Sequence, residues 1–294
     1  MMSAVQAIAR RGSAGEALPV VYQVLADREA FIYKGQLTLV VGPPSAGKST
    51  LTANLLMAMQ EPALAFLLDI DQTSAVARLA AIASGDRFLD VKASIDNYAD
   101  MLFDKAGHIQ MVFRAVDMDD IKLQLEAYSQ RYGEPPAVLL VDNAGNLTSG
   151  LDQEWAALKA LTLELDEIAR DEQVAVILCH HVTDLDSAEP AQRTKILGKI
   201  SQYPRLILSV GFNPASQAFK IAVVKNSSGP SDINAQNPIV MHSEPSRMLL
   251  SEHAPPPPHP QVVQARQERP NYIEQFNDPD LTGSVKKGYS GWRG

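Results

Sequence analysis

Short apolar runs separated by longer segments with helical periodicity recur along most of this chain. The first run, residues 36–41, precedes a helical pattern at 49–59 in which Leu51, Leu55 and Met59 share one face. Short continuous apolar runs are typical of strands buried on both faces of a parallel sheet, and the segments between them are typical of crossover helices. The pattern therefore predicts an α/β fold with a mostly parallel central sheet flanked by helices.

The same alternation continues to about residue 224. In sheets of this kind ligands bind at the carboxyl ends of the strands, so the residues that end each run are the first candidates for chemistry. Residues 206–210 and 219–224 are two short strand patterns around a polar turn, which predicts antiparallel strands at the C-terminal end of the sheet. The other strands are expected at residues 63–68, 108–115, 137–141 and 174–179. The other helices are expected around Leu79, Leu125 and Leu161, with an amphipathic segment around Met101.

The chain has 294 residues, of which 46% are apolar, and this is enough for one domain with a substantial core. Residues 1–18 lack strong periodicity and are expected to form an N-terminal arm or a disordered end, whereas 19–30 should lead into the core. We assign 19–253 to the folded domain. The segment 254–294 is Pro-rich and polar and is expected to be a disordered tail. Its four aromatic residues predict a docking peptide for a replication or recombination partner.

The composition says more about the compartment and the possible binding partners of the protein than about its activity. The formal net charge of −8 gives no general polycation signal, so any contact with nucleic acid must be local. The single cysteine, Cys179, cannot form an intrachain disulfide and is expected to be a buried core residue. No apolar run approaches the ~20 residues that span a bilayer. We therefore expect a cytoplasmic protein that does not contact membranes.

The sharpest local pattern follows the first apolar run. Residues 42–49 fit Gly-x-x-x-x-Gly-Lys-Ser/Thr, the pattern of a phosphate-binding loop. In such a loop, backbone N–H groups and the N-terminus of the next helix surround the phosphates, the lysine reaches the β- and γ-phosphates, and the hydroxyl is a magnesium ligand. The alternative is a Gly-rich turn with no ligand. We expect ATP and Mg²⁺ as ligands of the residues Gly42, Pro43, Pro44, Ser45, Ala46, Gly47, Lys48, Ser49 and Thr50, with the metal on Ser49.

Carboxylates end two of the predicted strands. Asp142 follows four aliphatic residues in the form of a Walker B segment, and a carboxylate at the tip of a buried strand needs a cation or a hydrogen-bond donor. We predict that Asp142 binds magnesium. Asp69 follows the run at 63–68 and is the candidate that polarises the attacking water. Asp71 is a weaker candidate for that role, and either aspartate could instead be the N-cap of the next helix.

Two further groups of polar residues follow. His180 and His181 end the strand at 174–179, and one of them is a candidate sensor of the γ-phosphate. A metal pair is not expected there, because neighbouring side chains of a strand point to opposite faces. The polar segment that follows carries Arg193, Lys195 and Lys199, which are candidates for binding single-stranded DNA phosphates. An ordinary solvated loop is the alternative interpretation of these three charges.

The order of these pieces resembles the RecA-like ATPase core shared by DnaB-type replicative helicases and RepA-type plasmid helicases. The resemblance implies a RecA-like P-loop NTPase fold, with Asp69 as the catalytic carboxylate, Arg78 as the arginine of the following helix, His180 as the sensor and Lys225 as a cation that acts on a neighbouring subunit. The segments that carry the resemblance are 68–71, 77–79, 138–142, 180–181 and 225–230, and it covers roughly residues 19–250.

Two departures from the family pattern bear on activity. Asp69 stands where the family has a glutamate, and Ser227 stands where it has the trans-acting arginine finger. Lys225 is the expected replacement, and Arg205 a less secure one. We expect an ATP hydrolase that works as a helicase-like motor on single-stranded DNA in replication, assembled from identical subunits as a hexameric ring or a filament. The alternatives are a RecA-like recombination or annealing ATPase and a nucleotide-switched loader or regulator.

Overall fold

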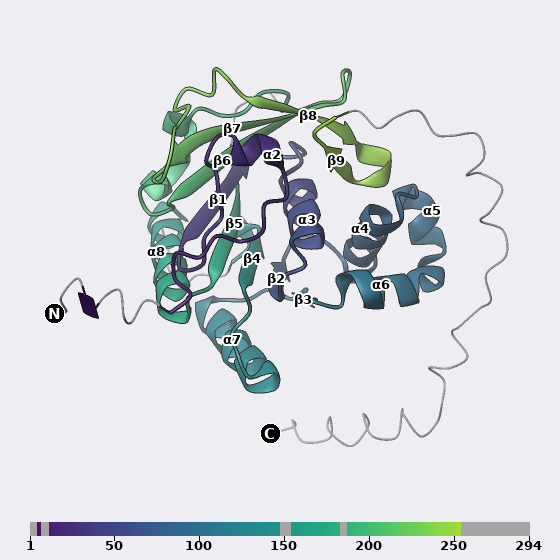
Figure 1. The fold of residues 1–294 in the computed structure, drawn as a ribbon, viewed down its shortest axis with the longest axis horizontal. Helices are drawn as coiled ribbons and strands as arrows, with labels where there is room; N and C mark the ends of the chain where they lie inside the picture. Colours follow the sequence, from purple (N-terminus) through teal and green to yellow (C-terminus); the bar gives the residue numbers. More distant parts are fainter. Residues whose placement is uncertain (1–4, 7–11, 148–153, 183–186, 254–294) are drawn as a thin grey trace.

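A computed structural model of the chain describes residues 5–6, 12–147, 154–182 and 187–253. In this part of the chain nine strands form one sheet in the order β3-β2-β4-β5-β1-β6-β7-β8-β9 (Figure 1). The strands are β1 (Leu37–Gly42), β2 (Ala63–Leu67), β3 (Ile109–Val112), β4 (Val138–Asp142), β5 (Ala175–His181), β6 (Leu206–Asn213), β7 (Ala218–Asn226), β8 (Ile239–Glu244) and β9 (Leu249–Ser251). The α/β prediction is confirmed, as is the hairpin between 206–210 and 219–224, which β6 and β7 form as antiparallel neighbours.

In the part of the sheet from β3 to β6 all neighbouring strands are parallel, so the carboxyl ends of β2, β4, β5 and β1 lie at one edge of the sheet. The residues of β1, β2, β4, β5 and β6 are mostly buried, because helices cover both faces, whereas three of the four residues of the edge strand β3 are only partly buried. One face packs against α3 (Lys48–Met59) and the other against α7 (Met118–Tyr132) and α8 (Glu154–Glu172). Cys179 lies fully buried in the face that carries α3, as expected.

A helical segment connects β2 to β3, where the sequence predicted one helix and an amphipathic stretch. It consists of α4 (Gln72–Ser84), α5 (Phe88–Ala93), a 3₁₀ turn at Ile95–Tyr98 and α6 (Ala99–Ala106), which pack on one another through small residues of α4. The strand predicted at 108–115 is shorter, because only Ile109–Val112 pairs with β2. None of the helices in the described ranges is long and apolar enough to cross a membrane.

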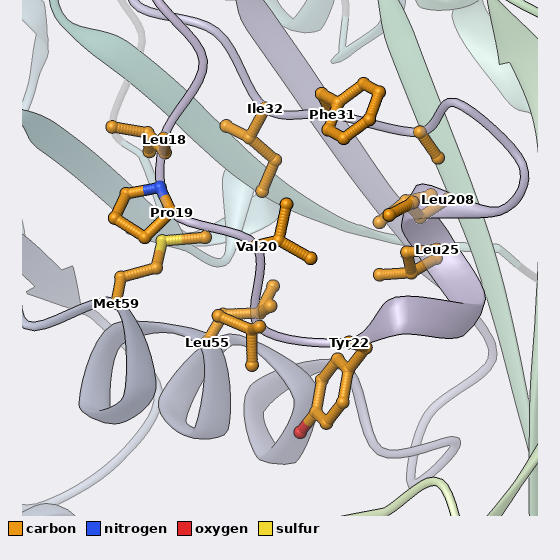
Figure 2. A pocket seen from close by; sticks show the side chains of 13 residues that line it. Leu18, Pro19, Val20, Tyr22, Leu25, Phe31, Ile32, Leu55, Met59 and Leu208 are labelled. Carbon is orange, nitrogen blue, oxygen red and sulfur yellow. The ribbon is translucent and has the colours of Figure 1, made fainter.

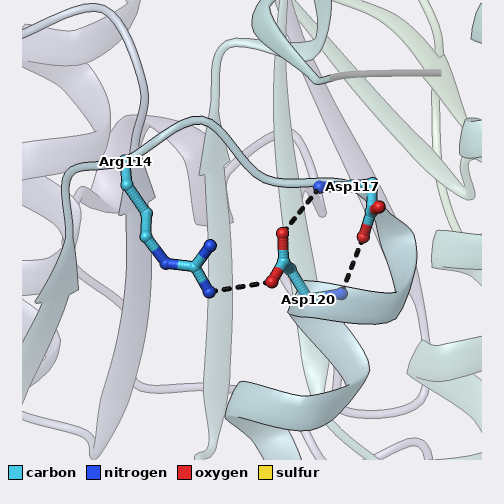
Figure 3. A network of polar contacts seen from close by, with 3 residues as sticks. All are labelled: Arg114, Asp117 and Asp120. Carbon is cyan, nitrogen blue, oxygen red and sulfur yellow. Dashed lines mark hydrogen bonds and ion pairs between the residues drawn. The ribbon is translucent and has the colours of Figure 1, made fainter. Parts of the chain in front are cut away.

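The N-terminus of α7 is fixed by three charged residues (Figure 3). Asp117 is the N-cap, and its carboxylate accepts a hydrogen bond from the backbone N–H of Asp120 at 2.8 Å, while the Asp120 carboxylate accepts one from the Asp117 N–H at 3.3 Å. Arg114 pairs with the other oxygen of Asp120 at 2.8 Å. This capping box satisfies donors that the first turn of a helix leaves free, so the helix begins at a defined residue behind the sheet.

The N-terminal segment packs more closely on the domain than the sequence indicated. Leu18 is buried, and its N–H donates to the Ile32 carbonyl. Residues 19–30 lead into the core as predicted, through the short helix α2 (Gln23–Ala26). Together with Leu55 of α3 and Leu208 of β6 they enclose an apolar cavity of about 30 Å³ (Figure 2). The packed part of the chain therefore begins before residue 19, although the domain limits remain a prediction and the tail 254–294 lies outside the described residues.

Strands β8 and β9 extend the sheet beyond the predicted hairpin. The Asn54 side chain of α3 donates to the Met248 carbonyl at 2.8 Å and accepts from the Leu250 N–H at 3.3 Å. This buried amide ties β9 to the helix that begins at the phosphate loop. The sequence did not indicate these strands, because both are short and only one face of each is apolar.

Candidate active site

Residues 43–47 connect β1 to α3 in the backbone geometry that an anion needs. Ser45 and Gly47 have left-handed backbones, with φ of 63° and 90°. Gly47 also has no room for a side chain, since a Cβ there would lie 2.6 Å from the Phe219 ring. The first turn of α3 carries no acidic residue, so its positive N-terminal end faces the loop uncompensated. The loop thus has the form of an anion nest at a helix N-terminus.

Lys48 lies within this loop with its ammonium group fully hydrogen-bonded. Its Nζ donates to the carbonyls of Gly42 and Pro43, each at 2.9 Å, and lies 2.9 Å from Nδ1 of His181. Because an ammonium has three protons, a phosphate that binds Lys48 must replace at least one of these partners. Burial lowers the pKa of Lys48, while the charges of Asp142 and Asp69 raise it. The lysine is therefore positioned for an anionic ligand and is near two of the predicted carboxylates.

Asp142 ends β4 directly beside the loop. The side chain is 3% exposed, and its Oδ1 has no hydrogen-bond partner among the described residues. Burial raises the pKa of Asp142, and the neighbouring Ser49 hydroxyl lowers it. A cavity of about 20 Å³ lined by Ser49, Asp142 and Arg78 adjoins the carboxylate, which is enough space for one water molecule. An unpartnered carboxylate oxygen next to a hydroxyl is a suitable ligand set for Mg²⁺.

The two aspartates after β2 have different surroundings. Asp71 is the N-cap of α4, and its Oδ1 accepts from the Ser74 N–H at 2.9 Å, so the N-cap alternative is correct for this residue. Asp69 lies exposed in the turn after β2, and its charge acts on Lys48, Arg78 and Asp142. Asp69 is thus the carboxylate of the pair that faces the loop.

Arg78 of α4 lies between these carboxylates. It lines the cavity beside Asp142, and its Nε is buried without a hydrogen-bond partner in the described part of the chain. Burial lowers the pKa of Arg78, and the charges of Asp142 and Asp69 oppose that effect. The sequence indicated Arg78 only as a family landmark, and the structure brings it to the same site.

The structure places the two histidines of β5 on opposite faces of the sheet. His181 lies on the face of α3 and contacts Lys48, whereas His180 follows Leu178 on the face of α7 and α8. His180 is buried, neither of its nitrogens has a hydrogen-bond partner among the described residues, and burial lowers its pKa to about 4. The structure therefore brings His181 rather than His180 to Lys48, while the sensor role expected of His180 stays a prediction.

Lys225 lies far from this loop in its own chain. It pairs with Ile207 of β6, which lies opposite Leu39 of β1. Its Nζ donates to the carbonyls of Ser201 and Gln202, at 2.9 and 2.8 Å. Because these carbonyls precede β6, which runs parallel to β1, the ammonium points away from the carboxyl edge where the loop lies.

The three candidate DNA contacts lie on two 3₁₀ turns between β5 and β6. Arg193 and Lys195 belong to the turn Arg193–Lys195, in which Arg193 is half-buried and Lys195 exposed. Lys199 belongs to the turn Leu197–Gln202, and its side chain lies outside the described part. The described residues before these turns, 187–192, include Glu189, which pairs with Lys220.

Comparison with known proteins agrees with this geometry. The AAA domain family matches residues 26–186. The gene 65 proteins of Mycobacterium phages L5 and D29 are each 30% identical, over 247 residues (79% of this chain, 91% of the L5 protein) and 218 residues (67% and 90%), respectively.

Solved structures resemble the chain over most of its length. An isolated ATPase domain superposes with a TM-score of 0.68 at 13% identity over 84% of this chain and 95% of that domain. A DnaB-like replicative helicase, solved with its interactions with primase, superposes with a TM-score of 0.69 at 13% identity over 84% of this chain and 66% of that one. At this level of identity the likeness concerns the fold, and it confirms the predicted RecA-like architecture, with a mostly parallel sheet and antiparallel strands at its C-terminal end.

Proposed function

Because this chain belongs to the AAA domain family, we propose that it is a magnesium-dependent ATPase of the replicative-helicase type that acts as a motor on single-stranded DNA. The observation that carries the proposal is the unpartnered Oδ1 of buried Asp142 beside Ser49, at the edge of the sheet where Lys48 and Asp69 also lie. A buried carboxylate oxygen without a hydrogen-bond donor is costly unless a cation binds it.

Different residues of the chain bind the phosphates, the metal ion and the attacking water. The backbone of residues 42–47 and the N-terminus of α3 bind the phosphates, and Lys48 moves from its carbonyl partners to the β- and γ-phosphates. Ser49 and Asp142 hold Mg²⁺, which supplies charge neutralisation of the triphosphate when bound. The charge of Arg78 offsets the negative charges of Asp142 and Asp69.

Asp69 accepts a proton from the attacking water. A bond forms between the water oxygen and the γ-phosphorus, the bond from that phosphorus to the bridging oxygen breaks, and ADP and phosphate leave. His181 loses its contact with Lys48 when the lysine turns to the phosphates. Since His181 ends the strand that leads to the two 3₁₀ turns, its release couples nucleotide binding to the segment with the candidate DNA contacts Arg193, Lys195 and Lys199.

The position of Lys225 supports assembly into a ring or filament. This lysine cannot reach the phosphate loop of its own chain, so as a catalytic cation it would act on the nucleotide of a neighbouring subunit. The likeness to a DnaB-like replicative helicase supports a role in replication. The similarity to the gene 65 proteins does not distinguish among the three candidate functions.

The test is ATP turnover with and without single-stranded DNA, over a range of protein concentrations, followed by unwinding of a forked duplex. We expect turnover that rises with assembly and with DNA. Lys48→Ala and Lys225→Ala should each be inactive, and a co-assembled mixture of the two should regain activity, because some interfaces pair an intact loop with an intact lysine. Lys34→Ala, which removes a partly exposed ion pair with Glu16 before the start of β1, away from the loop, is the matched control.

Turnover that is independent of concentration and DNA, with no recovery in mixtures that co-assemble, would contradict the motor and favour a self-contained nucleotide switch. DNA-dependent turnover on long filaments without unwinding would favour the recombination or annealing ATPase. Absence of ATP binding in wild-type protein would contradict all three.

A further inference from the structure

The Lys48 ammonium makes three hydrogen bonds within the chain, and one of them is to a side chain. The carbonyl oxygens of Gly42 and Pro43 accept two of its protons, each at 2.9 Å, and Nδ1 of His181 lies 2.9 Å from the same nitrogen. An ammonium has three protons and no lone pair, so Nδ1 must accept the third proton. The His181 ring is therefore neutral, with its own proton on Nε2.

The surroundings of His181 favour this neutral form. Burial lowers the pKa of His181 below its usual 6.5, and the charge of Lys48 acts in the same direction, whereas the charges of Asp69 and Asp142 oppose them. A protonated ring would place a second positive charge beside the ammonium and would offer it no acceptor. At neutral pH the imidazole is thus available as an acceptor for Lys48.

The pairing of two strands sets the position of this histidine. Strand β5 is parallel to β1, and His181 lies directly opposite Gly42, the first residue of the phosphate loop. The next residue, Val182, donates its N–H to the Gly42 carbonyl at 3.1 Å. Because the backbone at the end of β5 is tied to the start of the loop, rotation of the His181 side chain is the motion that makes or breaks its contact with Lys48.

The two carbonyl partners of Lys48 cannot turn away as easily. The Gly42 carbonyl also accepts from the backbone at the end of β5, and the Pro43 carbonyl accepts from the Ala46 N–H at 3.2 Å. Both carbonyls therefore belong to the backbone hydrogen bonds that shape the loop, and moving either one would distort the loop that has to bind the phosphates. The hydrogen bond to His181 is thus the first one that a phosphate oxygen can replace.

We propose that His181 is a positioning residue that competes with the phosphates of a nucleotide for the third proton of Lys48. The inference rests on the proposed ATPase function, and it adds a cost to nucleotide binding that the loop pattern alone does not include. The nucleotide must release the lysine from His181 before the lysine can reach the β- and γ-phosphates. The histidine thus acts on the nucleotide through the lysine.

Competition of this kind weakens nucleotide binding in proportion to the fraction of molecules in which the Lys48 proton is free. A hydrogen bond to a charged group is among the stronger ones in proteins. Because His181 is partly exposed, water can replace part of the interaction, and we expect the lower end of that range, a ~10-fold weakening of ATP binding. A residue that only supported the fold would have the opposite effect, since its removal would weaken binding.

The experiment measures ATP binding by calorimetry, in the presence of magnesium, for wild type and for variants of position 181. His181→Leu fills a similar space without an acceptor and should bind ATP ~10-fold more tightly than wild type. His181→Asn places Oδ1 the same number of bonds from the backbone as Nδ1, so it should keep the contact with Lys48 and the wild-type affinity. His253→Leu, which changes an exposed histidine, is the matched control.

A second readout follows the histidine itself. In protein with isotope-labelled histidines, NMR of the ring nitrogens should show His181 with an unprotonated Nδ1, and the His181→Leu spectrum assigns this signal by its loss. Addition of ATP should shift the signal, and so should Lys48→Ala, because each removes the hydrogen bond from the ammonium. A protonated Nδ1, or a signal that Lys48→Ala leaves unchanged, would overturn the proposal.

The outcomes separate this proposal from the proposed function. If wild type binds ATP and His181→Leu binds it equally or more weakly, the role of His181 is overturned and the ATPase remains intact. Absence of ATP binding in all of these proteins would instead contradict the proposed function, and with it the role of His181. If His181→Leu fails to fold, as judged by circular dichroism, His181→Ala removes the same acceptor and should also bind ATP more tightly; wild-type affinity in that variant overturns the proposal.

Discussion

His180 provides a sharp test of which histidine of β5 belongs to the site. Its imidazole is buried on the face of α7 and α8, without hydrogen-bond partners among the described residues, and burial lowers its pKa from 6.5 to about 4. Between these two pH values the unfolded chain binds a proton at this position and the folded chain does not. The free energy of unfolding must therefore fall as the pH decreases from 6.5 to 4.

The size of this loss in the free energy of unfolding follows from the difference between the two pKa values. At about 1.4 kcal/mol for each pKa unit, the difference between 6.5 and about 4 corresponds to about 3 kcal/mol, lost progressively across this window and constant outside it. The substitution His180→Leu removes the titration and replaces unpartnered nitrogens with apolar atoms. We expect this variant to be as stable as wild type at pH 7 or more stable by about 1 kcal/mol, and to lose about 3 kcal/mol less on acidification.

Urea unfolding followed by circular dichroism from pH 7.5 to 4 measures the difference. His253→Leu, which changes an exposed histidine, is the control and should retain the wild-type pH profile. In the same preparations, His180→Leu should keep ATP turnover and His181→Leu should lose it, because only His181 contacts Lys48. A wild-type pH profile for His180→Leu would refute the burial argument, and loss of turnover in His180→Leu with retention in His181→Leu would reinstate the original sensor prediction.

Three further results are expected. Asp69→Asn should bind ATP but hydrolyse it ~10²-fold more slowly or worse, because it removes the proton acceptor. Asp71→Asn should keep both turnover and stability, because the asparagine oxygen can also cap the helix. The reverse pattern in a turnover assay would reassign the base. Gly47→Ala should abolish ATP binding measured by calorimetry, since its Cβ would meet the Phe219 ring at 2.6 Å and its φ of 90° disfavours a side chain; wild-type affinity would show that the loop is not the site. Truncation before Pro255 should leave the melting temperature and basal turnover nearly unchanged, because a Pro-rich polar segment buries little apolar area, and loss of folding would move the domain boundary.

Features that depend on residues close together in the chain could be predicted from the sequence alone. The phosphate loop at 42–49 was readable because backbone N–H groups, a lysine and a hydroxyl must follow one another in a fixed order around a phosphate. Buried strands such as 138–142 were readable because burial on both faces leaves a continuous apolar run that ends in a polar residue. The N-cap role of Asp71 could be foreseen as an alternative, since a short carboxylate before a helical pattern is a local signal.

Tertiary structure decided what depends on residues far apart in the chain. Strand alternation put His180 and His181 on opposite faces, but which face carries α3 is set by the order in which the strands assemble, so the sequence could not choose between them. The same holds for the contact between His181 and Lys48, which arises because β5 pairs with β1 and so ends beside the phosphate loop. A cluster of like charges or an unpartnered carboxylate oxygen cannot be predicted from the order of residues. Charge repulsion and desolvation depend on which residues are neighbours in space, and many of these neighbours are far apart in the chain.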